Sequence, residues 1–135
     1  MILVDSCVLI DVLENDPKWA DWSQRQLDVA ALNHPLAINA VIYAELSVGF
    51  RRMEECDAML ASAKIDLRDI PREALFLAGK AFQRYRARGG TRTSALPDFF
   101  IGAHAAVLGI PLLTRDMRRY ADYFPSLALL APDAA

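Results

Sequence analysis

Four acidic side chains in this sequence have the spacing and surroundings of metal ligands: Asp5, Glu45, Asp98 and Asp116. Asp5 and Asp116 each follow a short apolar run that is typical of a buried strand. Glu45 and Asp98 have small or apolar residues three and four positions away, so no neighbour on the same helix would compensate a buried charge. A hard divalent cation such as Mg²⁺ or Mn²⁺ would compensate these charges, because it binds several carboxylate oxygens. The set therefore predicts a metal-dependent hydrolase whose cation activates a bound water.

Each of these carboxylates also has a purely structural interpretation. Asp5 could cap the following helix, and Asp98 could simply offset the dipole of the helix that it begins. Glu45 could pair with a distant arginine, and Asp116 with an arginine beside it in an exposed ion pair. The metal-site prediction therefore depends on the four residues as a set.

Other polar residues near the acids have more ordinary expected roles. Ser6 and Thr114 lie beside two of the acids and could hydrogen-bond a metal-bound water, although helix capping is the simpler role for Ser6. Asp11 and Glu14 are expected on the solvent face of the first helix. His104, on an apolar helix, is expected to be a hydrogen-bonded core histidine.

Short apolar segments alternate with helical patterns along the chain. The expected strands are residues 2–4, 35–38, 65–70, 111–114 and 127–130, and the expected helices are 6–13, 16–32, 40–50, 54–64, 71–88 and 97–108. This alternation predicts one three-layer α/β domain over residues 1–135, with a short central parallel sheet flanked by helices. In such sheets ligands gather at the carboxyl ends of the strands, where the four acids could meet.

The composition favours a folded protein over a disordered or membrane-embedded chain. Hydrophobic residues make up 54% of the sequence. The longest apolar run, residues 99–113, contains His104 and Pro111 and is too short to span a bilayer. The two cysteines are far apart, as free thiols in a reducing compartment would be. With no pattern typical of a signal peptide at Met1, we expect a cytoplasmic protein.

The segments around the four acids resemble those of the PIN-domain ribonucleases, in particular the VapC toxins of bacterial type II toxin–antitoxin pairs. The matching segments are ILVDS at 2–6, VLID at 8–11, AEL at 44–46, LPDFFIGA at 96–103 and LLTRD at 112–116. Together these segments are specific, and they cover nearly the whole chain. The family often has threonine where this chain has Ser6, and the position of Asp116 varies.

This resemblance implies a Mg²⁺- or Mn²⁺-dependent endoribonuclease with Asp5, Glu45, Asp98 and Asp116 as its acidic quartet. It also implies a homodimer and a cognate VapB-like antitoxin that blocks the site. Basic residues that could contact the RNA backbone are Lys80, Arg84, Arg88, Arg92 and Arg115, and the first three share one helix face. The same stripe could equally be a solvated surface.

Other classes fit the sequence less well. A haloacid-dehalogenase-like phosphatase requires a second acid two positions after Asp5, where this chain has Cys7. A receiver domain requires a lysine near its last strands, and none follows Lys80. Two alternatives remain open: a PIN-like nuclease that acts on another nucleic acid, and a PIN-like binding module without catalytic activity.

Overall fold

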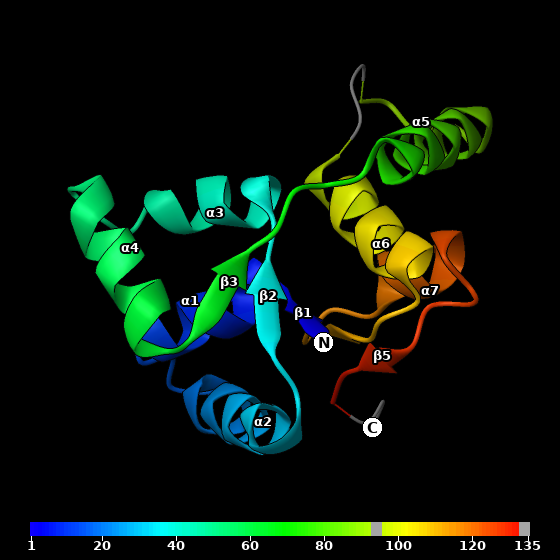
Figure 1. Cartoon of the computed structure of the whole chain (residues 1–135). Helices are drawn as coiled ribbons and strands as arrows, with labels where there is room; N and C mark the ends of the chain where they lie inside the picture. The colour runs from blue at the N-terminus through cyan, green and yellow to red at the C-terminus, as the bar shows by residue number, and fades with distance from the viewer. Residues whose placement is uncertain (93–95, 133–135) are drawn as a thin grey trace.

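A parallel sheet of five short strands lies at the centre of the computed structural model, which describes residues 1–92 and 96–132. The strands are β1 (Ile2–Val4), β2 (Leu36–Ile38), β3 (Ile65–Leu67), β4 (Leu112–Leu113) and β5 (Leu129–Leu130). Their order is β3-β2-β1-β4-β5, and neighbouring strands pair in parallel (Figure 1). The predicted α/β fold with a short central parallel sheet is therefore confirmed.

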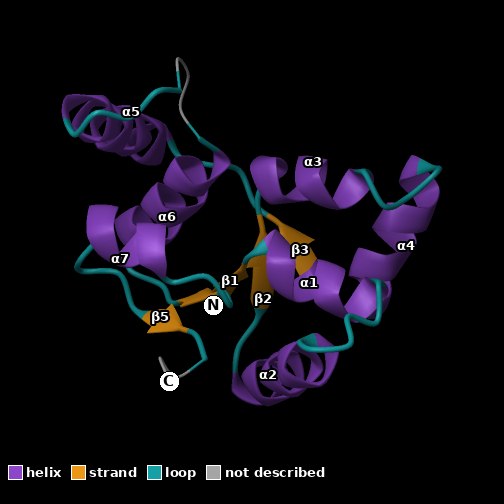
Figure 2. Cartoon of the chain, turned by 180° about the vertical axis from the view of Figure 1, so that it is seen from behind, coloured by secondary structure: helices purple, strands orange, loops and turns teal. Residues whose placement is uncertain are grey.

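Helices cover both faces of this sheet. In the described residues they are α1 (Ser6–Leu13), α2 (Ala20–Asn33), α3 (Ala40–Ser47), α4 (Met53–Ser62), α5 (Arg72–Ala87), α6 (Pro97–Leu108) and α7 (Arg118–Tyr123). Figure 2 shows α5, α6 and α7 grouped on one side of the strands and α1 to α4 on the other. In the part of the chain that the structure describes, no helix is both long and apolar enough to cross a membrane.

Strands β1 and β4 are neighbours in the sheet, but the chain leaves them toward opposite edges. From β1 it proceeds through β2 to β3 at one edge, and it then returns to β4 and β5 on the other side of β1. In the pairing of β1 with β4, Val4 lies opposite Leu113, so Asp5 and Thr114 follow at adjacent strand ends. Such a switch point is where open α/β sheets bind their ligands.

Helix α6 packs against α3, α5 and α7, and the centre of the helix is buried, as its apolar sequence predicted. Phe99, Ile101 and His104 are each at most 1% exposed. Pro97 is its first residue, and Gly109 ends it in the left-handed conformation with φ of 66°. The helix is therefore a fixed support for Asp98 in its first turn.

Three of the differences from the local predictions concern α2 and α7. The second helix begins at Ala20 rather than at residue 16, because the Asp16 carboxylate caps a separate turn by accepting hydrogen bonds from the backbone N–H groups of Lys18 and Trp19. The helical spacing of Trp22 and Val29 predicts that both side chains face inward, but Val29 is 58% exposed, since that face of α2 points to solvent. Helix α7 was not predicted, and neither was its contribution to the site.

Candidate active site

Asp5 is the centre of the candidate site. It lies at the end of β1, is 6% exposed and caps α1 by accepting a hydrogen bond from the Ser6 N–H at 2.8 Å. Its other oxygen, Oδ2, accepts from the Thr114 hydroxyl at 2.9 Å and from the Tyr120 hydroxyl at 3.0 Å. Burial raises the pKa of Asp5, and these hydrogen bonds partly oppose that rise. Asp5 is thus both the predicted helix cap and the centre of the cluster.

Glu45 reaches Asp5 through a shared hydroxyl. The Ser6 Oγ donates to Glu45 Oε1 at 3.0 Å and lies 3.5 Å from Asp5 Oδ1. The pKa of Glu45 is raised, first by partial burial and then by repulsion from Asp5 and Asp98, while the Ser6 hydrogen bond lowers it. Glu45 therefore feels the charge of both other acids.

Asp98 reaches Asp5 through a second hydroxyl, that of Tyr120 on α7. Tyr120 is 1% exposed, and its hydroxyl lies 3.0 Å from Asp5 Oδ2 and 3.4 Å from Asp98 Oδ1. Burial and the charges of the two acids raise the pKa of Tyr120. Its hydroxyl consequently stays protonated and can donate to either carboxylate.

Sequence reasoning missed Tyr120, although the sequence contains a signal for it. Tyr120, Tyr123 and Phe124 have the three- and four-residue spacing of one helix face, and all three are buried. That pattern is typical of a short amphipathic helix after Asp116. The helix has only 6 residues, and a periodic pattern this short does not distinguish a helix from a loop.

Asp116 is less closely joined to the site than the other three acids. Its side chain is exposed, and its backbone N–H donates to the Thr114 hydroxyl at 3.1 Å. An open cavity of about 430 Å³ is lined by both Asp98 and Asp116, with Arg118 on its rim. Asp116 therefore shares a cavity with Asp98 rather than a hydrogen bond with the central acid.

A buried polar contact holds α3, which carries Glu45, against α6, which carries Asp98. Asn39 caps α3 through its Oδ1, and its amide nitrogen lies 3.2 Å from His104 Nδ1. Burial lowers the pKa of His104, so the neutral ring accepts this hydrogen bond. The prediction of a hydrogen-bonded core histidine is confirmed.

The prediction for Asp11 is wrong, whereas Glu14 is exposed as expected. Asp11 is 2% exposed, because α2 and the segment after β4 cover that face of α1. Arg115 donates two hydrogen bonds to it, from Nε to Oδ2 at 2.8 Å and from Nη2 to Oδ1 at 3.0 Å. Arg115, a candidate RNA contact, is thus engaged in an ion pair within the chain, with 33% of its side chain exposed.

The donor set fits a hard divalent cation, although the side chains do not already surround one. Among the described residues, no three histidine, cysteine or acidic side chains form a group that could hold a metal. Hydroxyls instead stand between the carboxylates, Ser6 between Asp5 and Glu45, and Tyr120 between Asp5 and Asp98. Burial and repulsion from Asp5 and Asp98 both raise the pKa of Glu45, and a bound cation would relieve that repulsion. Metal binding stays a prediction.

The basic stripe of α5 lies partly against α7. The Arg84 Nη2 donates to the Tyr123 carbonyl at 2.8 Å, and the Arg88 guanidinium lies 4.9 Å from the centre of the Tyr123 ring. Lys80 lies over the Phe76 ring. These residues and Arg92 are exposed, so RNA binding by the stripe stays a prediction.

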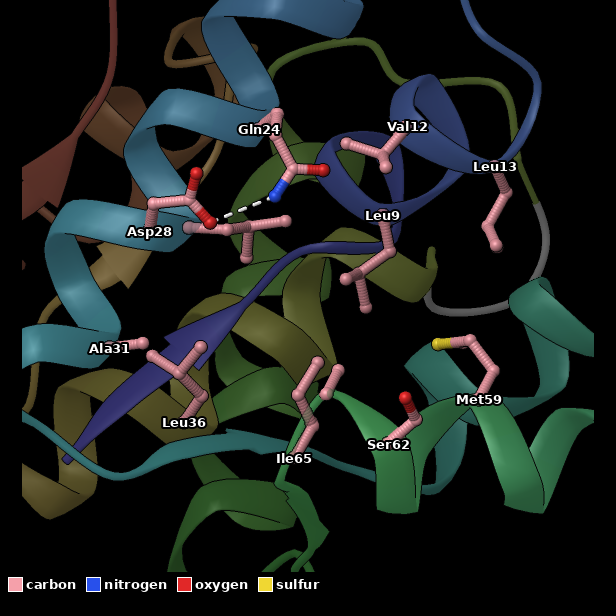
Figure 3. Close-up of a pocket in the computed structure, with 12 residues that line it drawn as sticks. Leu9, Val12, Leu13, Gln24, Asp28, Ala31, Leu36, Met59, Ser62 and Ile65 are labelled. Carbon is pink, nitrogen blue, oxygen red and sulfur yellow. Dashed lines mark hydrogen bonds between the residues drawn. The ribbon is translucent and has the colours of Figure 1, made fainter.

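A separate apolar cavity of about 300 Å³ lies between α1, α2 and α4, away from the acids. Leu9, Leu36 and Ile65 line it, and Gln24 donates to Asp28 at its edge at 2.9 Å (Figure 3). Its lining lacks the clustered carboxylates of the site around Asp5. The acidic cluster is therefore the candidate active site, and this cavity is separate from it.

Comparison with known proteins identifies the family. The sequence profile of the PIN domain matches residues 2–123, so the chain belongs to the PIN-domain family. A comparison with curated protein sequences found no match.

Solved structures with the same fold include chains of three toxin–antitoxin complexes. VapBC2 from Rickettsia felis, bound to a DNA fragment from its promoter, has a TM-score of 0.73 and 21% identity over 98% of this chain and 100% of its own. VapBC-1 from nontypeable Haemophilus influenzae has a TM-score of 0.71 and 18% identity, over 97% of this chain and 98% of its own. A toxin–antitoxin complex from Klebsiella pneumoniae has a TM-score of 0.68 and 21% identity, over 95% of this chain and 96% of its own. At these identities the likeness shows a shared fold.

Proposed function

We propose that this protein is a metal-dependent endoribonuclease and the toxin of a toxin–antitoxin pair. PIN domains are nucleases, and the family match covers all four predicted acids. The observation that carries the proposal is the arrangement around Asp5, which shares one hydroxyl with Glu45 and another with Asp98. The structural neighbours that are toxin–antitoxin complexes support the toxin role and a VapB-like antitoxin as partner.

In this proposal Asp5, Glu45 and Asp98 hold Mg²⁺ or Mn²⁺, and Asp116 assists from the rim of the shared cavity. When bound, the cation lowers the pKa of a coordinated water and neutralises charge on the scissile phosphate. Thr114 and Tyr120 keep Asp5 in place by donating to its Oδ2. Histidine is not part of the scheme, because His104 is 1% exposed and engaged with Asn39.

The hydroxyl of Ser6 orients the acids in the absence of metal. It donates to Glu45 Oε1 and keeps that carboxylate facing Asp5. With a cation held by these carboxylates, the same hydroxyl would be available to hydrogen-bond a bound water. The frequent threonine at this position in the resembling family would preserve that hydroxyl.

The direct test is RNA cleavage by the purified protein with Mg²⁺, with Mn²⁺ and with excess EDTA. We expect cleavage only with metal. Glu45→Gln should lower the rate by at least the roughly 10- to 100-fold that is lost when a partner of a metal ligand is removed. Glu73→Gln, an exposed site at the start of α5, is the matched control and should retain activity. Undiminished cleavage in EDTA would refute the metal mechanism.

The same assay separates the alternatives. Cleavage of single-stranded DNA of matched sequence at a rate equal to that of RNA would favour a nuclease for another nucleic acid. Binding of RNA without cleavage under both metals would favour the non-catalytic binding module. For the toxin role, expression of the protein alone should arrest growth, and co-expression of the cognate antitoxin should restore it.

A further inference from the structure

An ion pair between buried Asp11 and half-buried Arg115 joins α1 to the segment that follows β4. Both oxygens of Asp11 accept from the forked guanidinium of Arg115, at 2.8 and 3.0 Å. The Ser23 hydroxyl, on α2, donates to Asp11 Oδ2 at 2.9 Å, and the guanidinium lies 5.5 Å from the centre of the Trp19 ring. A two-pronged contact of this kind fixes orientation as well as distance. We call this pair the Asp11–Arg115 clamp.

Each of the two residues of the clamp lies next to a part of the proposed active site. In sequence, Arg115 lies between Thr114 and Asp116. The Thr114 hydroxyl donates a hydrogen bond to Asp5 and accepts one from the backbone N–H of Asp116. Asp11 lies on α1, the helix that Asp5 caps. One contact therefore ties the segment with two site residues to the helix that begins at the central acid.

We propose that the Asp11–Arg115 clamp positions residues 114–116 over Asp5, so that Arg115 is a positioning residue rather than an RNA contact. The geometry of the clamp is independent of the bound ligand, but its consequence for metal binding rests on the proposed function. Active-site side chains must be held in position to a fraction of an ångström. Residues 114–116 form an irregular segment, which lacks the regular backbone hydrogen bonds of a helix or strand that would hold them.

Arg115→Lys is the informative variant. It keeps the positive charge beside Asp11 but loses the planar fork, so the pair can form without fixing the segment. Arg52→Lys is the matched control, because Arg52 makes an exposed ion pair with Glu54 far from the site. Removing Asp11 is less informative, since the guanidinium would lose its buried partner and the fold itself could fail.

Cys7 is a natural reporter of this segment. Its Sγ lies 3.6 Å from the Thr114 hydroxyl, and the backbone N–H of Arg115 also contacts the thiol. Alkylation of native, metal-free protein, read by peptide mass spectrometry, should be faster at Cys7 in Arg115→Lys by about fivefold or more, as expected for local opening. Arg52→Lys should match wild type. An unchanged rate at Cys7 overturns the proposal, and so does an equal rise at Cys56, which is buried in α4 and reports general unfolding.

Metal and RNA binding provide the second measurement. The Mg²⁺ concentration that gives half of the maximal thermal stabilisation should rise several-fold in Arg115→Lys. Lysine would keep the charge of a phosphate contact, so the dependence of RNA affinity on salt is measured in Arg115→Gln. The wild-type slope should be kept in that variant, whereas loss of a phosphate contact would reduce it by about 0.7 and overturn the proposal. If wild-type protein shows no response to Mg²⁺, the proposed function fails, and labelling of Cys7 still decides whether the clamp positions the segment.

Discussion

The carboxylate of Asp5 is buried without a salt bridge to any basic side chain that the structure describes. Hydrogen bonds to charged groups contribute about 1.5–3 kcal/mol each, and Asp5 accepts them from the Ser6 N–H and from the hydroxyls of Thr114 and Tyr120. These neutral donors offset the cost of burial while leaving the negative charge in place. A cation that approaches the site therefore meets an anion rather than an ion pair.

Glu45 gives the site a pH-dependent cost in the absence of metal. Its pKa is raised above the ordinary value of 4.5 in the folded protein. Below pH 4.5 both states are protonated, and no stability is lost. As pH rises from 4.5 through the folded pKa, the unfolded chain releases a proton that the folded protein retains, so the folded state loses stability.

Glu45→Gln should remove this cost. In EDTA, the melting temperature of Glu45→Gln minus that of wild type should grow as pH rises from 4.5 to 7.5. The gain should be a few °C at most, because water reaches this half-buried carboxylate and screens its interactions. Calorimetry at matched ionic strength measures the difference. Glu73→Gln, which removes an exposed charge elsewhere, should show no such gain. A difference that is flat with pH would mean that neither burial nor the neighbouring acids raise the pKa of Glu45 in the folded protein.

Tyr120→Phe tests the hydroxyl that joins Asp5 and Asp98. We expect a 10- to 100-fold loss of RNA cleavage, roughly the effect of removing a partner of a metal ligand. The free energy of unfolding should fall by only about 1–2 kcal/mol, because Asp5 keeps its other donors. Tyr43→Phe is the control, since its hydroxyl also donates to a carboxylate, Asp57, but at an exposed site. Wild-type cleavage by Tyr120→Phe would exclude the hydroxyl from the chemistry.

At the scale of elements, the site depends on how closely α7 packs against α6. A Cβ at Gly102 would lie 2.5 Å from the Phe124 ring and 3.0 Å from the Tyr120 ring. Only a residue without a side chain permits this approach. The helix that carries Asp98 thereby places the tyrosine hydroxyl within reach of both acids.

Gly102→Ala should push α7 outward and carry Tyr120 with it. Overpacking of this kind costs about 1–3 kcal/mol, and RNA cleavage should fall together with the melting temperature. Gly79→Ala, on α5, is the matched control, because nothing lies within 4 Å of its added Cβ. That variant should gain about 0.5–1 kcal/mol from its lower chain entropy. Equal behaviour of the two variants would show that the α6–α7 contact is loose.

At the scale of the whole molecule, charge is divided along the chain. Acidic side chains outnumber basic ones before Arg84, and the reverse holds from Arg84 onward. The fold packs α5 against α6, which carries Asp98, and Arg84 of α5 contacts Tyr123 of α7 (Figure 2). A polyanion can therefore approach the acidic site along a basic flank.

Replacing Arg84 and Arg88 together with glutamine should weaken RNA binding and flatten its salt dependence by about 0.7 per lost phosphate contact. The double variant should also melt lower, because Arg84 donates to the Tyr123 carbonyl. Binding titrations at several salt concentrations separate these effects. The control replaces Arg51 and Arg52, exposed on the opposite side of the sheet, with glutamine. An unchanged slope would leave the stripe with a structural role alone.

Local sequence patterns were sufficient to determine much of this protein. The alternation of apolar runs and helical periods predicted the parallel sheet, since each run is short and bounded by turn residues. The positions of Asp5 and Thr114 at strand ends followed from the same pattern. The apolar neighbours of Glu45 and Asp98 along their helices were enough to mark those carboxylates as unusual, because an uncompensated charge is costly to bury.

Only the tertiary structure decided which side chains meet. Tyr120 and Asp5 are 115 residues apart in the chain, and Arg115 and Asp11 are 104 apart. Helical periodicity shows that a face is apolar or polar, but it does not show which distant segment covers it. Periodicity alone therefore places Asp11 in solvent, although α2 and the segment after β4 enclose it. Contacts of this kind arise when packing selects among surfaces that look alike in sequence.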